Sequence, residues 1–146
     1  MLARDYFESL LTLESDLKRA KDRLELAENK LDGLGHSGTS SVASRSVDPD
    51  KFTNRICAVD KAREQLKENY DCLVEREAEA MDIIDHVGDP ALRCTGLWRE
   101  CLELRYLRNM TIREVSSRVD VSNSTVHNAI SNAFSWIDAS ELLVHL

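Results

Sequence analysis

The side chains best suited to specific recognition lie near the C-terminus and are polar but uncharged. Val126 and Ile130 are spaced as on the inner face of a helix, and hydrogen-bonding residues fill the positions around them. We expect the following residues to point outward: Asn123, Ser124, His127, Asn128, Ser131 and Asn132. An Asn amide can pair bidentately with adenine, and Ser and His can donate to or accept from several base edges. The pattern therefore predicts contacts to bases in a duplex groove.

A short helix is predicted just before these residues. Thr111 can cap it, and Glu114, three residues later, completes the pattern of a capping box. Ile112, Val115 and Val119 follow at helical spacing and would form one apolar face. This helix can therefore pack against a neighbour through a single face.

A tight turn and a second short helix should follow. Asp120 lies where the chain must turn, and Asp tolerates a positive φ better than most residues. Ser122 can cap the second helix, and Ser116 is small where the two helices should cross. The apolar face of the second helix reads Val126, Ile130, Ala133, Phe134 and Ile137. The arrangement is that of a DNA-binding helix-turn-helix.

Phosphate contacts would come from residues around this motif, because helix N-termini favour anions and Arg pairs with phosphate. The candidates are Arg108, Thr111, Arg113, Arg118 and Ser122. Residues 121–137 contain neither Lys nor Arg, so the commonest specific contact, Arg or Lys to guanine, cannot form there. Two alternatives follow: the second helix binds A·T-rich DNA through Asn, helped by dimerisation, or it docks on a protein.

The stretch LRYLRNMTIREVSSRVDVSNSTVHNAISNAFSWI, residues 104–137, resembles region 4 of bacterial sigma factors. The whole chain is similar to phage and prophage regulators with such ends, related to ArpU-like late transcription regulators. The resemblance implies transcriptional regulation through promoter DNA or RNA polymerase, and no catalytic activity. The chain departs from the sigma pattern in its uncharged second helix, since sigma-type recognition helices usually carry several Lys or Arg.

The N-terminal part predicts a long helix with a regular heptad pattern, as in a coiled coil. Apolar residues alternate at spacings of three and four: Ala3, Tyr6, Leu10, Leu13, Leu17, Ala20, Leu24, Ala27, Leu31 and Leu34. A flexible linker near residues 33–48 follows, with three Gly and a Ser/Thr cluster. Such a helix cannot bury its own stripe and must pack on a partner.

A second long helix should begin near Pro49 and end at Gly88. Its stripe reads Phe52, Ile56, Val59, Leu66, Tyr70, Leu73, Ala80, Ile84 and Val87, and Arg63 and Glu77 interrupt it. The simplest arrangement folds it back antiparallel on the first helix, although the linker also permits exchange between two chains. Gly88, Asp89 and Pro90 should end it and start a third helix that runs to about Arg108.

We therefore predict an all-α fold: a long antiparallel helical hairpin of coiled-coil type over residues 1–88, then a sigma-region-4-like helix-turn-helix domain over residues 89–146. Two helices bury little apolar area, which favours a homodimer with a four-helix arrangement. Alternatively, the C-terminal helices dock along the hairpin and complete a monomer. The apolar tail, with Leu142, Leu143, Val144 and Leu146, should pack on the core or across an interface.

Composition narrows the function classes. The net charge of −7 argues against a protein that coats nucleic acid through a bulk positive field. The acid excess lies in residues 1–88, with 13 Lys/Arg against 19 Asp/Glu, while residues 89–146 hold 6 against 7. No stretch is long and apolar enough to span a membrane and the N-terminus lacks a signal-peptide order, so we expect a cytoplasmic protein.

The four cysteines show no CxxC pair, and we expect free thiols rather than disulfides or a structural zinc site. Cys94 and Cys101 lie seven residues apart, and we favour a packed pair of small side chains over metal binding. No phosphate loop, paired-His motif or nucleophile elbow is present, so we expect no enzyme, no cofactor and no metal. The expected function is a dimeric phage-type transcriptional regulator that binds DNA, RNA polymerase or both. The alternative is a coiled-coil adaptor or inhibitor whose helix-turn-helix docks on a host protein.

Overall fold

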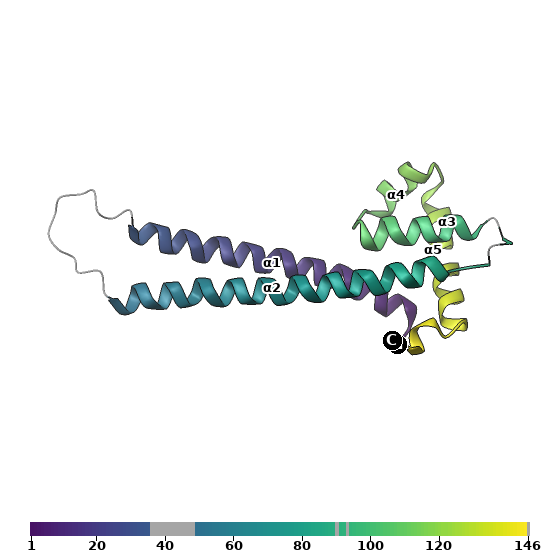
Figure 1. Cartoon of the computed structure of the whole chain (residues 1–146). Helices are drawn as coiled ribbons and strands as arrows, with labels where there is room; N and C mark the ends of the chain where they lie inside the picture. The colour runs from purple at the N-terminus through teal and green to yellow at the C-terminus, as the bar shows by residue number, and fades with distance from the viewer. Residues whose placement is uncertain (36–48, 90, 93, 146) are drawn as a thin grey trace. The chain divides into compact units, whose positions relative to one another are not determined.

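The computed structural model describes residues 1–35, 49–89, 91–92 and 94–145, and this part of the chain is built from helices without strands (Figure 1). The helices are α1 (Ala3–Gly35), α2 (Pro49–His86), α3 (Thr95–Leu102), the π-helical segment η2 (Glu103–Leu107), α4 (Ile112–Val119), α5 (Asn123–Ala139) and the 3-10 helix η3 (Leu142–His145). The predicted all-α class is confirmed, with long N-terminal helices that pack together and a C-terminal helical domain. Most of the predicted linker lies outside the described residues, and α1 continues through Gly33.

The chain divides into two compact units. The hairpin unit comprises Leu13–Cys72, and the terminal unit comprises Met1–Thr12 together with Leu73–Leu146. Both long helices contribute to both units, so the C-terminal helices share a core with the first turns of α1 and the last turns of α2. The division at residue 88 stays a prediction.

In the hairpin unit, α1 and α2 run antiparallel and side by side (Figure 1). Arg55 Nη1 donates a hydrogen bond to the Lys30 carbonyl at 2.5 Å, and Asn69 Nδ2 donates to the Asp16 carbonyl at 3.4 Å. Residue numbers therefore fall along α1 as they rise along α2. The two helices fold back on each other within one chain.

Most of the predicted stripe residues are shielded from solvent. Leu10, Leu17, Val59, Leu73 and Ile84 are buried. Leu13, Leu24, Leu31 and Leu66 are half-buried. Both classes follow the 3.5-residue period, as expected for two long helices in contact.

The α2 stripe differs from the prediction at three large residues: Phe52, Ile56 and Tyr70 are 45%, 37% and 55% exposed. At Ile56 and Tyr70, the polar residue one position earlier in the sequence faces α1 instead. Arg55 and Asn69 are half-buried and hydrogen-bond to carbonyl groups of α1. The prediction assigned the inward positions to the larger apolar side chains. Two of these positions are instead taken by residues that donate hydrogen bonds to carbonyl oxygens of α1.

An aromatic cluster forms the centre of the terminal unit. The Phe7 ring lies 5.5 Å from that of Tyr106 and 5.6 Å from that of Phe134 between centroids, and Phe7 is fully buried. The Ala3 N–H donates to Asp138 Oδ1 at 2.7 Å, which satisfies one free donor at the start of α1. The first turns of α1 are thus anchored against α5.

The junction between α2 and α3 differs from the prediction. Gly88 adopts φ +88 as a helix-ending glycine should, but α3 begins at Thr95 instead of near Pro90, which lies outside the described residues. The Asp89 carboxylate accepts from the Ala91 N–H at 2.9 Å, and the Thr95 hydroxyl donates to the Leu92 carbonyl at 2.8 Å. Asp89 therefore stabilises a turn before the helix and does not cap it.

Candidate nucleic-acid interface

The capping box at the start of α4 is present as predicted. The Thr111 N–H donates to Glu114 Oε2 at 2.7 Å, and the Glu114 N–H donates to Thr111 Oγ1 at 3.3 Å. The bond from the Thr111 N–H is the main reason that the pKa of Glu114 is lowered, since it favours the charged carboxylate. The two residues fix where α4 begins.

The turn between α4 and α5 is closed by its own hydrogen bonds. Asp120 adopts the left-handed conformation, with φ 55 and ψ 48, as the sequence predicted. Ser116 Oγ donates to the Val121 carbonyl at 2.6 Å, and the Val121 N–H donates to the Ser116 carbonyl at 3.2 Å. Ser116 therefore contributes a bond across the turn in addition to its small size. Ser122 then caps α5, because its Oγ accepts from the Thr125 N–H at 3.2 Å.

Helix α5 separates an apolar inner face from a polar outer face. Its predicted inner residues, Val126, Ile130, Ala133, Phe134 and Ile137, are all buried. The six candidate base-contacting residues are all exposed: Asn123, Ser124, His127, Asn128, Ser131 and Asn132. All six lie in the N-terminal two-thirds of α5, the part of the second helix that a helix-turn-helix presents to DNA. Their contact with bases stays a prediction.

The candidate phosphate contacts are also exposed, at Arg108, Thr111, Arg113, Arg118 and Ser122. Arg113 and Arg118 line a shallow hollow of about 450 Å³ on the outer side of α4, together with Met110, Glu114 and Ser117. Arg108 Nη2 lies 3.4 Å from Glu103 Oε1, an exposed pair of small energetic value. Arg113 and Arg118 are thus exposed cations of α4, the helix that precedes α5.

Two further arginines of this region have internal roles that the sequence did not reveal. Arg105 Nη1 donates to the Met110 carbonyl at 2.8 Å, which holds the segment between η2 and α4. Arg99 Nε donates to the Val87 carbonyl at 2.7 Å, which ties α3 to the end of α2. Both acceptors are backbone groups that no local sequence pattern marks. These side chains position the motif and are already engaged.

Three of the four cysteines lie on the surface, and one lies in the core. Cys57, Cys72 and Cys94 are exposed, and Cys94 precedes α3, so the packed pair that we predicted with Cys101 does not form. Burial raises the pKa of the Cys101 thiol to about 11, and the nearby Glu100 carboxylate adds to the shift. Across the described residues, no group of three or more His, Cys, Asp or Glu side chains is placed to hold a metal ion.

Comparison with known proteins identifies the motif. Residues 98–136, about a quarter of the chain, match the family model for sigma-70, region 4. Searches of curated proteins and of solved structures gave no match. No described helix has the length and apolar character needed to cross a membrane. The matched segment begins inside α3 and ends near the end of α5, so it contains both capped helices: the chain carries a helix-turn-helix similar to sigma-70 region 4.

Proposed function

We propose that this chain is a transcriptional regulator that binds promoter DNA through the outer face of α5. The supporting observation is the set of six exposed hydrogen-bonding residues on a helix whose start, turn and inner face are all fixed. In a helix-turn-helix, the N-terminal part of the second helix enters the major groove and contacts base edges. The match to sigma-70, region 4 covers this segment.

The side chains favour A·T-containing sites. Asn123, Asn128 and Asn132 can each pair bidentately with adenine, and His127 can donate or accept. Arg113 and Arg118 would contact the flanking phosphates. Because few cations are present, we expect a weak salt dependence of binding and a need for a second copy to reach useful affinity.

The proposal extends to the cellular role. The sequence resemblance supports a regulator of phage or prophage type that acts in the bacterial cytoplasm. The small apolar area that two helices bury supports a homodimer formed through the N-terminal helices. RNA polymerase is a further proposed partner. No catalytic step belongs to this proposal.

Selection from a random duplex pool at low salt tests DNA binding. We expect enrichment of a short motif with A·T pairs by the natural chain. Asn128→Ala should lose preference at one position of that motif, since the amide is removed without disturbing a buried contact. Asn29→Ala, an exposed Asn of α1 in the hairpin unit, is the matched control and should enrich the same motif as the natural chain. Absence of an enriched motif, or equal enrichment with Asn128→Ala, would contradict the proposal.

A second candidate function rests on one observation, the absence of Lys and Arg from residues 121–137. In that case the outer face of α5 docks on RNA polymerase or another host protein, and the chain acts as an adaptor or inhibitor. Binding to purified RNA polymerase, measured with and without His127→Glu, distinguishes the two. The docking function requires binding without DNA that is weakened by this substitution.

A further inference from the structure

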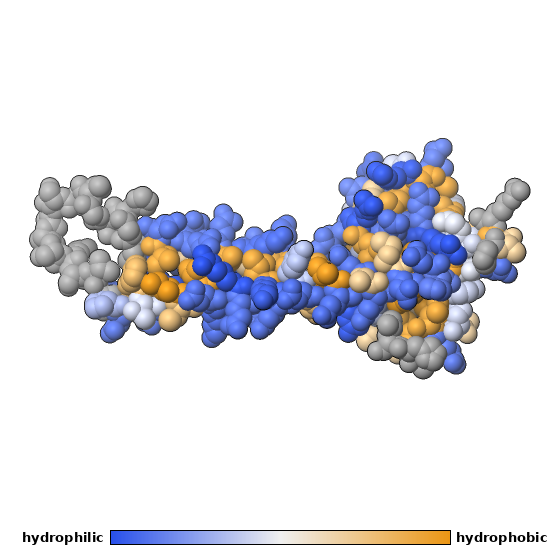
Figure 2. Space-filling view, viewed as in Figure 1, coloured by the Kyte–Doolittle hydropathy of each residue, from blue (hydrophilic) through white to orange (hydrophobic). Residues whose placement is uncertain are grey.

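A groove lined by small side chains and cations runs between α1 and α2 in the hairpin unit. Its volume is about 420 Å³, and its lining includes four alanines, Ala20, Ala27, Ala58 and Ala62, together with Leu26 and Gln65. Four cationic residues surround it: Arg23, Lys30, Arg55 and Lys61. No Asp or Glu is among the described residues that line it. We call this feature the alanine groove; Figure 2 shows apolar residues between hydrophilic ones along this part of the chain.

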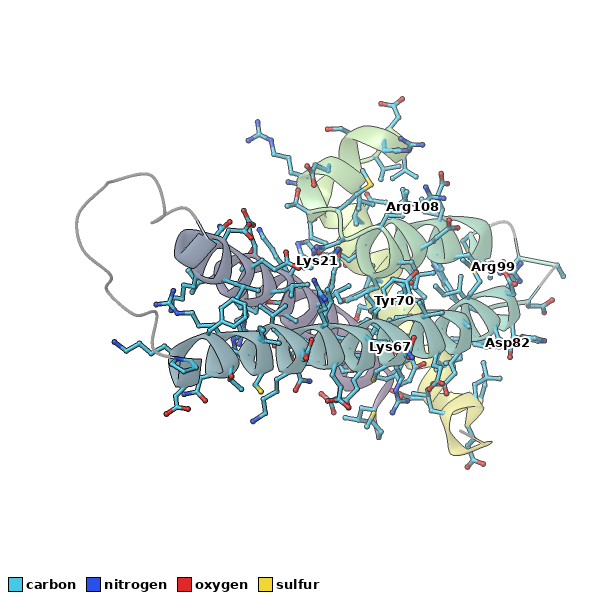
Figure 3. All side chains as sticks on the ribbon, turned by 60° about the vertical axis from the view of Figure 1, so that its left-hand side comes forward. Lys21, Lys67, Tyr70, Asp82, Arg99 and Arg108 are labelled. Atoms are coloured by element: carbon cyan, nitrogen blue, oxygen red, sulfur yellow. The ribbon has the colours of Figure 1, made fainter. Side chains whose placement is uncertain are left out.

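The last turns of α2, in the terminal unit, have the opposite character. Val74 and Met81 lie seven residues apart on one face of the helix and are 44% and 41% exposed. Exposed carboxylates flank them at Glu75, Asp82 and Asp85. We call these five residues the acidic ridge; Asp82 lies on the outer side of α2 (Figure 3).

The groove and the ridge match in charge, shape and spacing. Val74 and Met81 carry large apolar side chains, and the four alanines of the groove lining leave room for them beside Leu26. Seven residues of helix span about 10 Å, and the same separation relates Ala20 to Ala27 in the groove lining. The ridge carboxylates would meet the groove cations, which have no acidic neighbour in the lining.

We propose that the acidic ridge of one copy of this chain packs into the alanine groove of a second copy. The occupant is a second copy because the chain itself carries a surface that complements the groove in charge and spacing. Each copy offers one groove and one ridge. In the proposed dimer, two such contacts related by a two-fold axis satisfy both surfaces and close the assembly at two copies. This inference rests on the proposed dimerisation and names the surfaces that carry it.

A second cation-lined hollow is a poorer receptor. It measures about 310 Å³ and is lined by Lys21, Arg63, Leu66, Lys67 and Tyr70, three of which are labelled in Figure 3. Its lining carries the larger Leu66 and Tyr70 side chains in place of alanines, and its volume is smaller than that of the alanine groove. Arg63 is also paired within the chain, with Nη2 3.1 Å from Glu28 Oε1. The alanine groove has the larger volume, and its lining cations form no ion pair among those found in the described residues.

Charge reversal tests the pairing without reference to DNA. The groove variant carries Arg23→Glu and Lys61→Glu, and the ridge variant carries Glu75→Lys and Asp82→Lys. Light scattering at micromolar concentration and low salt should give twice the mass of one chain for the natural protein and a single-chain mass for each variant. An equimolar mixture of the two variants should regain the doubled mass, because an acidic groove then meets a basic ridge in one contact and a natural groove meets a natural ridge in the other. The doubled mass should also fall at high salt.

Two controls keep the outcomes distinct. A variant with Lys18→Glu and Lys51→Glu changes the net charge equally at exposed residues outside the groove, and it should keep the doubled mass. The mixing result separates a lost interface from a lost fold, since misfolded variants would not rescue each other. A single-chain mass for the natural protein, a doubled mass for either variant alone, or a mixture that stays at the single-chain mass would each overturn the pairing. Motif selection is independent: a monomer that enriches a motif contradicts this inference and the proposed dimerisation but not DNA binding, and a dimer that enriches none contradicts only DNA binding.

Discussion

The two units of this chain reach their structure by different means. The terminal unit has a core of rings and branched side chains, and its helices begin and end at identifiable hydrogen bonds, such as the capping box of Thr111 and Glu114. The hairpin unit has a thin contact in which Leu17, Ala20 and Val59 are buried and its other contact residues are half-buried. A complete core fixes the geometry of a surface that recognises a partner. A thin core leaves apolar surface exposed to solvent, and a partner can cover that surface.

The largest expected effect is a difference in the free energy of unfolding between alanine substitutions in the two units. Phe7→Ala should lower the free energy of unfolding by about 3–5 kcal/mol, because it removes a fully buried ring and leaves a cavity beside Tyr106 and Phe134. Phe52→Ala, at an exposed position of the hairpin unit, should cost less than about 1 kcal/mol. Urea unfolding followed by circular dichroism measures both. Equal costs would remove the contrast between the units.

Alanine substitutions at two glycines should change the stability of the chain in opposite directions. Gly88→Ala should destabilise the chain by about 1–3 kcal/mol, since φ is +88 and a Cβ would lie 2.4 Å from Thr95 Cβ. Gly33→Ala should stabilise it by about 0.5–1 kcal/mol, because Gly33 is helical and a Cβ there meets no atom within 4 Å. Thermal unfolding of the two variants gives the signs directly, and a gain for Gly88→Ala would contradict the junction described above.

The cap of α4 should contribute a smaller and pH-dependent amount. Thr111→Ala should cost about 1 kcal/mol. The folded-state pKa of Glu114 is lowered, so its contribution is complete above the pKa of the unfolded chain and disappears as the pH falls through the folded value. The stability difference between the natural chain and Glu114→Gln should therefore be present at neutral pH and vanish in acid. A difference that grows in acid would show that the carboxylate is not the stabilising form.

The smallest perturbation is chemical labelling of the thiols. Cys57, Cys72 and Cys94 should react readily with a disulfide reagent in the native state. Cys101 should react only after unfolding, because it is buried and its thiol pKa is raised to about 11. Mass spectrometry of a timed reaction resolves the four sites. Early labelling of Cys101 would mean that the core around α3 opens readily.

Local signals in the sequence predicted the parts of the motif that depend on neighbouring residues. Thr111, Glu114, Asp120 and Ser122 act within a few residues of themselves, so their types and spacing define the two helix starts and the turn. The heptad pattern likewise predicted two long helices in contact. The α5 outer face followed from the same reasoning, because inner positions on a helix determine the outer ones.

Features that depend on distant contacts could not be predicted. Phe7 lies outside the heptad stripe, and only the fold brings it to Tyr106 and Phe134. Arg55 and Asn69 occupy inward positions because carbonyls of α1 accept their hydrogen bonds, a reason that no local pattern of α2 contains. The later start of α3 is a local exception: hydrogen bonds from the Ala91 and Leu92 N–H groups to Asp89 form a turn that competes with the helix that Pro90 suggested.

The central claim is that the polar outer face of α5 contacts DNA and that the hairpin unit does not. Side-chain amide resonances of the asparagines report on both units in one titration with a selected duplex. We predict that the amide signals of Asn123, Asn128 and Asn132 shift with added duplex, while those of Asn29 and Asn54 in the hairpin unit stay in place. Unmoved α5 amides, or shifts confined to the hairpin unit, would contradict the account.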